Sequence, residues 1–145
     1  MASYTATVVS PRPIDDVFGY LADFSTAPEW DENTVSSELT SGDPFVVGAK
    51  YKVVTEFGGR ELTLTYETVE IERPVRVVLE SGTGMAGIRD TMTFKSTPDG
   101  GTEVTYEANV SPKGIAKVLD PVFSLIFKRV GDKAVKGLRR ELDAK

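Results

Sequence analysis

Hydrophobic residues recur along this chain at two spacings, which alternate in a fixed order. Spacings of three and four residues, typical of an amphipathic helix, occur in Pro13–Phe24 and again in Pro121–Leu142. Alternation of hydrophobic and polar residues, typical of a half-buried strand, occupies seven shorter stretches. The expected strands are Tyr4–Val9, Val35–Leu39, Tyr51–Phe57, Glu61–Ile71, Val75–Glu80, Ile88–Lys95 and Thr102–Val110. The pattern predicts one strand, a helix, six strands and a long final helix.

Turn-forming residues and changes of phase refine these boundaries. Gly58-Gly59 favours a tight hairpin between two of the strands. Within Glu61–Ile71 the hydrophobic residues change phase near Glu67 and Thr68, which indicates a β-bulge. Two further short helical segments are expected, at Thr26–Trp30 and at Lys113–Leu119.

The final helix has one large hydrophobic surface left to cover, the inner face of the sheet. A long helix across a curved antiparallel sheet tends to leave a cavity between them. Gly131 and Gly137 lie inside this helix, where each costs roughly 1 kcal/mol relative to alanine, so a packing or clearance reason is expected. The chain has 145 residues, which is a usual length for one domain. We therefore expect residues 1–145 to form a single domain with a cavity between sheet and helix.

The inward faces of the strands, together with aromatic residues of the helices, supply candidate cavity residues. The predicted ligand-binding residues are Trp30, Tyr51, Val53, Leu64, Tyr66, Leu79, Asp90, Met92, Tyr106, Phe123 and Phe127. Such residues also fill ordinary cores, and for any single one of them core packing is the favoured alternative. The tyrosines favour a cavity, because a buried phenol needs a hydrogen-bonding partner.

Asp90 interrupts the hydrophobic stripe formed by Ile88, Met92 and Phe94. A carboxylate on an inward face is unfavourable unless it is paired or hydrated. Asp90 is therefore either a ligand anchor or a base with a raised pKa, or it is a strand-end residue that is open to water. We favour the strand-end interpretation. Asp90 is the best catalytic candidate, but we predict that it is not catalytic. The chain has no histidine to relay a proton, and the strand of Asp90 holds no neighbouring carboxylate to share acid and base roles.

Composition narrows the available chemistry further. The chain has no histidine and no cysteine, which excludes Ser-His-Asp triads, thiolate nucleophiles, disulfides and metal sites built from imidazole or thiolate. Carboxylate, lysine, tyrosine and arginine remain for catalysis. We expect no cofactor and no metal, no membrane span and no nucleic-acid partner. The expected protein is cytoplasmic, and a monomer or weak homodimer.

Charge is distributed unevenly along the chain. Residues 1–112 carry 8 basic and 18 acidic side chains, a net charge of −10, whereas residues 113–145 carry 9 basic and 4 acidic ones, a net charge of +5. The basic C-terminal helix either meets an anionic partner or lipid head group, or presents a solvated face attracted to the acidic sheet. We favour the second interpretation, because basic residues in the last turns also suit the helix dipole.

The residues around the first helix resemble those of the SRPBCC superfamily. The resemblance lies in Pro13–Phe24 (PIDDVFGYLADF), in Pro28-Glu29-Trp30-Asp31, and in the turn Gly100-Gly101-Thr102 before the last strand. This group includes START lipid-transfer domains, plant pollen-allergen-type hormone binders and bacterial polyketide cyclase/dehydrase-like proteins. The resemblance covers essentially the whole chain. It implies an α+β helix-grip fold, with a seven-stranded curved antiparallel sheet around the long C-terminal helix and two short helices after the first strand.

The resemblance specifies the fold better than the function, since the superfamily holds carriers and enzymes alike. The expected function is binding or transport of a small hydrophobic or amphipathic ligand, such as a lipid, an isoprenoid or a polyketide-like molecule. One alternative is a polyketide cyclase/dehydrase-type enzyme using Asp90 or a cavity tyrosine, although the absence of histidine argues against a histidine base. A second is a co-chaperone-like interaction module. Ionisable groups in the cavity would favour the enzyme, and an exposed hydrophobic patch would favour the interaction module.

Overall fold

The computed structural model describes residues 2–57, 59–82, 86–112 and 121–143, and the side chains of residues 3–56, 59–81, 87–110 and 128–142. Within these ranges the backbone forms seven strands, three α-helices and one turn of 3-10 helix. Their bounds are β1 (Ala2–Ser10), α1 (Ile14–Ala22), η1 (Phe24–Thr26), α2 (Ala27–Trp30), β2 (Thr34–Ser41), β3 (Lys50–Phe57), β4 (Arg60–Glu72), β5 (Arg76–Gly82), β6 (Ala86–Ser96), β7 (Thr102–Pro112) and α3 (Pro121–Asp143). The predicted order of elements is confirmed, while the short helix expected at Lys113–Leu119 lies outside the described residues.

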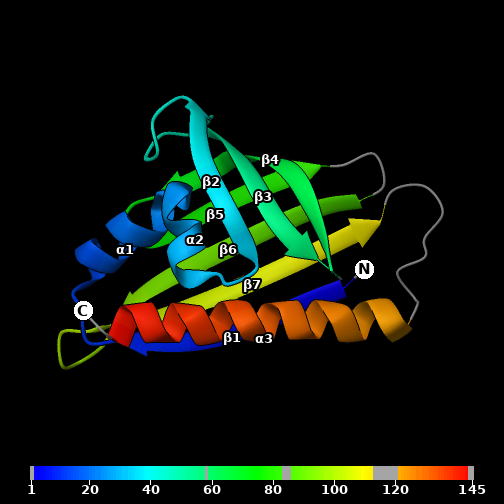
Figure 1. Ribbon diagram of the computed structural model, residues 1–145. Coiled ribbons are helices and arrows are strands. Elements are labelled where there is room, and N and C mark those ends of the chain that lie inside the picture. The colour runs from blue at the N-terminus through cyan, green and yellow to red at the C-terminus, as the bar shows by residue number, and fades with distance from the viewer. Residues whose placement is uncertain (1, 58, 83–85, 113–120, 144–145) are drawn as a thin grey trace.

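All seven strands form one antiparallel sheet in the order β1-β7-β6-β5-β4-β3-β2. In Figure 1 the long helix α3 runs beside β1 and β7, while α1 and α2 lie near one end of the sheet. The helix-grip fold expected from the sequence is therefore confirmed. No helix within the described ranges is both long and hydrophobic enough to cross a bilayer.

The local predictions hold with small shifts. Phe57 pairs with Arg60, which agrees with the expected hairpin between these strands, and Gly59 has the positive φ of 84° that such a turn favours. The bulge in β4 lies between Thr68 and Glu70, slightly later than the change of hydrophobic phase indicated. The strand expected from Val75 begins one residue later, at Arg76.

The hydrophobic stripe of α1 packs into the core as its periodicity predicted. Val17, Phe18 and Leu21 are fully buried, and the ring of Phe18 meets Phe94 of β6 edge-on with centroids 5.2 Å apart. Aspartates in the first turn of α1 complement the helix dipole. This packing fixes α1, and with it the chain segment that leads into η1 and α2.

Helix α3 is held closely against α2 and β1. A Cβ built on Gly137 would lie 2.9 Å from the carbonyl carbon of Trp30 and would overlap its oxygen, while one on Gly131 would lie 2.6 Å from the ring of Tyr4. Both helix glycines therefore have the packing reason that the sequence indicated. At the end of α3, the hydroxyl of Ser10 donates to the carbonyl oxygen of Leu142 at 3.1 Å.

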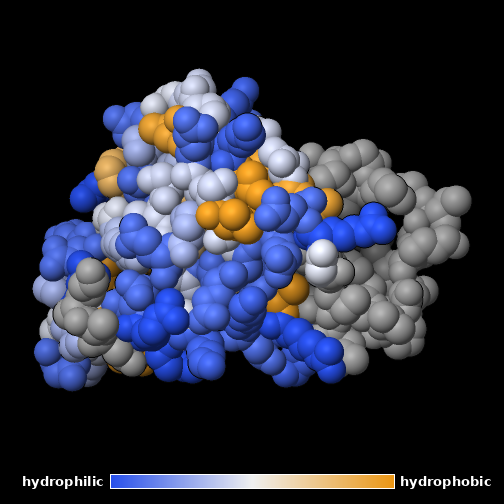
Figure 2. All heavy atoms as spheres, viewed as in Figure 1, coloured by the Kyte–Doolittle hydropathy of each residue, from blue (hydrophilic) through white to orange (hydrophobic). Residues whose placement is uncertain are grey.

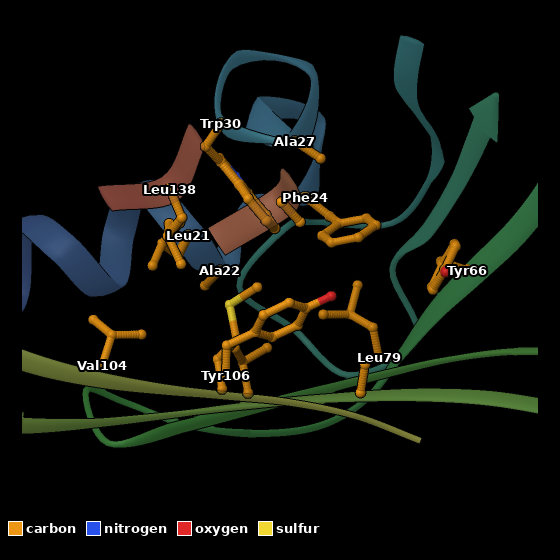
Figure 3. Close-up of a cluster of buried hydrophobic side chains, with 14 of the residues drawn as sticks. Leu21, Ala22, Phe24, Ala27, Trp30, Tyr66, Leu79, Val104, Tyr106 and Leu138 are labelled. Carbon is orange, nitrogen blue, oxygen red and sulfur yellow. The ribbon is translucent and has the colours of Figure 1, made fainter. Parts of the chain in front are cut away.

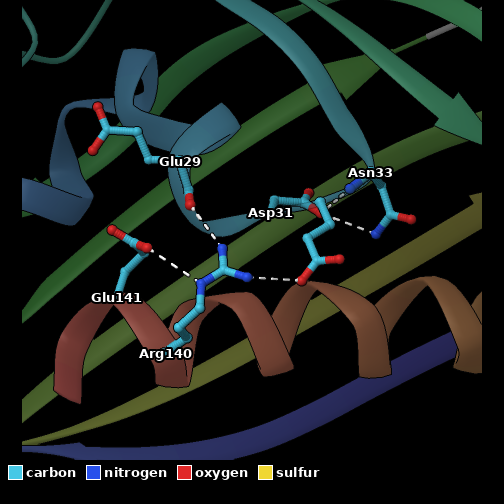
Figure 4. A network of polar contacts seen from close by, with 6 residues as sticks. Glu29, Asp31, Asn33, Arg140 and Glu141 are labelled. Carbon is cyan, nitrogen blue, oxygen red and sulfur yellow. Dashed lines mark hydrogen bonds and ion pairs between the residues drawn. The ribbon is translucent and has the colours of Figure 1, made fainter. Parts of the chain in front are cut away.

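The outer face of α3 is basic and exposed. Figure 2 shows mainly hydrophilic residues over the lower part of the molecule, where α3 lies, and the exposed side chains there include Lys133, Lys136 and Arg139. The guanidinium of Arg140 pairs with Glu32 at 3.2 Å and donates to the carbonyl oxygen of Glu29 at 3.3 Å (Figure 4). The acidic partner of Arg140 thus lies between α2 and β2.

Candidate functional site

The expected cavity between α3 and the strands is present, with a volume of about 100 Å³. Its wall is formed by η1, α2 and the residue that follows α2, by five strands, and by one residue of α3. The lining residues are Phe24, Trp30, Asp31, Thr34, Val53, Thr55, Leu64, Tyr66, Ile88, Asp90, Tyr106, Ala108, Val110 and Val130.

The structure brings about half of the predicted ligand-binding residues to this cavity. Those that line it are Trp30, Val53, Leu64, Tyr66, Asp90 and Tyr106. Tyr51, Leu79 and Met92 are fully buried in the core but do not line the cavity, and the side chains of Phe123 and Phe127 lie outside the described residues. Ligand binding by all of these residues remains a prediction.

Aromatic rings from the helices and the sheet meet around the cavity. Trp30 of α2 contacts Tyr106 of β7 edge-on with centroids 6.1 Å apart, and Phe24 of η1 lies 5.0 Å from the ring of Tyr66. In Figure 3 Trp30 and Phe24 come from the helical segments and face Tyr106 across the interior. Such contacts restrict the rings, so the wall is largely preformed.

Asp90 lies inside the protein, on β6 between two other strands. Its neighbours across the sheet are Leu79 and Ala108, and it is only 5% exposed. The interpretation of Asp90 as a strand-end residue open to water is therefore wrong, because strands on both sides and the helical segments cover it. Burial raises the pKa of Asp90 to about 7, with a further rise from nearby Asp31, while a hydrogen bond from Tyr106 lowers it.

Asp31, the first residue after α2, is the second carboxyl group of the cavity and was not predicted as a site residue. Its Oδ1 accepts hydrogen bonds from the backbone N and the Nδ2 of Asn33, both at 2.9 Å (Figure 4). Its Oδ2 accepts from the hydroxyl of Thr34 at 2.9 Å. Burial raises the pKa of Asp31, while these hydrogen bonds and the charge of Lys133 oppose the rise. The sequence signal was an ordinary turn motif, an aspartate that caps the backbone two residues later.

The two cavity tyrosines remain protonated. Burial, and then the charges of Asp90 and Asp31, hold the pKa of Tyr66 and of Tyr106 well above the usual value of 10. A protonated phenol is a hydrogen-bond donor as well as an acceptor. The indole Nε1 of Trp30 is another donor, and it is buried with no hydrogen-bond partner in the part of the chain that the structure describes. The cavity therefore combines two acidic groups with three donors in an aromatic wall.

A larger hollow of about 540 Å³ opens on the surface of the sheet. It is lined by Glu67, Glu80, Arg89 and Asn109, among others, and Arg89 forms an ion pair with Glu80 there. Arg89 and Glu80 satisfy one another in contact with water, so this hollow has the character of ordinary solvated surface. Within the described ranges no group of three or more acidic, histidine or cysteine side chains is placed to hold a metal ion.

Residues 1–143 match the protein family described as "Polyketide cyclase / dehydrase and lipid transport". The chain belongs to this family. The resemblance to the SRPBCC superfamily noted in the sequence is thereby confirmed. No functionally curated protein matches the sequence significantly.

Solved structures with the fold of this family member are numerous. A START superfamily protein from Mycobacterium smegmatis superposes with a TM-score of 0.79 at 10% identity, covering 98% of this chain and 97% of that one. A protein from Thermus thermophilus superposes with a TM-score of 0.78 at 15% identity, covering 97% of this chain and 96% of that one. The Zhui aromatase/cyclase from a Streptomyces species superposes with a TM-score of 0.75 at 12% identity, covering 97% of this chain and 90% of that one. At these identities the similarity establishes the fold alone.

Proposed function

We propose that this protein binds a small amphipathic molecule in the cavity between the sheet and α3. The observation that carries the proposal is the composition of the wall. Aromatic and aliphatic side chains surround buried polar groups, namely Asp31, Asp90, two phenols and the unpartnered Nε1 of Trp30. An apolar pocket with a few convergent polar groups is the usual form of a small-molecule site, in which the polar groups fix orientation.

The volume limits what enters the described part of the cavity. An engineered cavity of about 150 Å³ holds benzene, so about 100 Å³ accommodates a head group or a small part of a ring rather than an entire lipid. The ligand we propose therefore places its polar end beside Asp90, while the remainder of its hydrophobic body extends beyond the residues that line this volume.

The binding proposal is tested first by native mass spectrometry of the protein as expressed, which is expected to show a co-purified small molecule. It is tested second with 3-phenylpropan-1-ol, detected through the fluorescence of Trp30, the only tryptophan in the chain. Ala108→Leu fills part of the cavity and is expected to weaken probe binding by roughly tenfold or more, since each lost 1.4 kcal/mol is a factor of ten.

Thr63→Leu is the matched control for this experiment. Thr63 is exposed on β4 and does not line the cavity, so its replacement is expected to leave probe binding unchanged. Absence of both a co-purified molecule and a fluorescence change would contradict the proposal. Equal weakening by both substitutions would show that the probe does not bind in the cavity.

An enzymatic role is the second candidate, and the presence of both Asp31 and Asp90 in the cavity wall favours it. An acid-base catalyst works best with a pKa near the operating pH, and the pKa of Asp90 is about 7. The second carboxylate that β6 itself lacks comes instead from the turn after α2. A polyketide cyclase or dehydratase would lose turnover on Asp90→Asn while ligand affinity is retained, whereas a binding protein shows changes in affinity alone.

A further inference from the structure

The charges of the cavity wall all have one sign. Two carboxyl groups, Asp31 and Asp90, line the cavity, and among the described lining residues there is no lysine or arginine. A basic influence reaches Asp31 from Lys133, which is exposed on α3. A ligand carboxylate would bring a third acid into this space, with no cation in the described wall to receive it.

The two carboxyl groups differ in how many hydrogen bonds they already accept. Both oxygens of Asp31 already accept hydrogen bonds, from Asn33 and Thr34. From the described residues Asp90 receives one hydrogen bond, from Tyr106, while an ionised carboxylate has about four acceptor sites. Asp90 therefore has acceptor capacity left, on a group 5% exposed and close to a second acid.

The remainder of the wall suits a cation as well. Phe24, Trp30, Tyr66 and Tyr106 surround the cavity with aromatic rings, and aromatic faces attract ammonium groups that have been removed from water. The Nε1 of Trp30, buried with no hydrogen-bond partner among the described residues, is an independent sign that the wall faces a polar molecule, although as a donor it does not itself bind the ammonium group. An unpaired buried acid is costly, and an ammonium group offers three donors and the opposite charge.

From this arrangement we infer that the cavity selects ligands whose polar group is a protonated amine, over neutral or anionic ligands with the same hydrophobic body. The inference rests on the proposed function, because it names the chemical class of the ligand bound in that cavity. The ammonium group lies against Asp90, and the hydrophobic part packs against Trp30 and its aromatic neighbours.

The preference has a predictable dependence on pH. The titratable groups that face or influence Asp90 are Asp31, Tyr66 and Tyr106, with Tyr4 acting on Tyr106 and Lys133 on Asp31. An alkylamine stays protonated below about pH 10, so the group that changes is Asp90. If only the ionised form of Asp90 binds the amine, affinity rises about tenfold between about pH 6 and pH 8, as the competent fraction grows.

The experiment compares 3-phenylpropylamine, 3-phenylpropan-1-ol and 3-phenylpropanoate through Trp30 fluorescence at about pH 8. The amine is expected to bind roughly tenfold or more tightly than the alcohol, and the carboxylate more weakly than either. Asp90→Asn is expected to remove both the amine preference and the pH dependence. Asp16→Asn, which removes the same charge from an exposed position on α1, is expected to change neither.

The outcomes separate the two proposals. Binding of the alcohol or the carboxylate as tightly as the amine would overturn the amine selectivity while supporting ligand binding in the cavity. Failure of all three probes would contradict the proposed function itself. Should Asp90→Asn fail to fold, the pH profile of the wild-type protein decides, because amine affinity that is flat or falls between about pH 6 and pH 8 overturns the inference.

Discussion

Replacing Gly137 with alanine is expected to destabilise the protein by at least about 3 kcal/mol, although alanine is the better helix former. The added Cβ would overlap the carbonyl oxygen of Trp30, which is backbone and has no rotamer with which to move away. Relief requires α3 to separate from α2, and α2 carries a wall of the cavity. Urea unfolding measures the loss, and a shift in the emission of Trp30 would report the displaced wall.

Two other glycines serve as controls for this substitution. A Cβ on Gly19 of α1 meets nothing within 4 Å, so Gly19→Ala is expected to stabilise the protein by roughly 0.5–1 kcal/mol. Gly131→Ala meets the side chain of Tyr4, which can rotate, and an intermediate cost is expected. If Gly137→Ala behaved like Gly19→Ala, the close approach of α3 to Trp30 would be refuted.

The free energy of unfolding is expected to include a contribution from Asp90 that falls by about 4 kcal/mol between about pH 4 and pH 8. The pKa of Asp90 is raised by burial from 3.8 in the unfolded chain to about 7 in the folded protein. The folded state therefore holds the proton more tightly. The stabilising effect of this proton is complete below the pKa that Asp90 has in the unfolded chain. It is lost as the pH rises through the pKa that Asp90 has in the folded protein.

The quantity to measure is the difference in unfolding free energy between wild type and Asp90→Asn across this range. Asparagine does not ionise, so the variant is expected to gain stability relative to wild type as pH rises. Taking this difference cancels the contributions of other acids to the free energy of unfolding. One such acid is Asp132, whose pKa is lowered by Lys128 and whose contribution changes with pH in the opposite direction. With Asp16→Asn the difference is expected to stay small. A difference for Asp90→Asn that does not change with pH would mean that Asp90 is hydrated in the folded protein.

The sequence predicted the fold well because its signals are local. The periodicity of α1, the two-residue turn after Phe57 and the alternation of the strands each depend on neighbours in the chain. Alternation also identified the inward residues, but it does not say what lies above them. Tyr51, for example, is inward yet does not line the cavity, since Phe24 covers it with ring centroids 5.9 Å apart.

The polar residues of the site could not be predicted from such local patterns in the sequence. Asp31 and Asp90 line the same cavity because η1, β2 and α3 hold α2 and the turn after it against the inner side of the sheet, and no pattern within either segment indicates this. The absence of a second carboxylate on the strand of Asp90 was correctly noted, but nothing in the sequence indicated that the turn after α2 brings one from elsewhere in the chain. Likewise, the cost of Gly137 in a helix was visible in the sequence, whereas its reason, the carbonyl of Trp30, required the tertiary structure.

The pairing of β1 with β7 has a consequence for how the chain acquires its structure. Thr5 lies opposite Glu107, so the first strand joins the sheet through contacts that span roughly a hundred positions, and such non-local pairing slows folding. During synthesis β1 has no strand partner until β7 has been made, and α3, which packs on β1, comes later still. We expect the β2–β7 meander to form first in refolding experiments, with protection of β1 amides from hydrogen exchange appearing only as α3 docks.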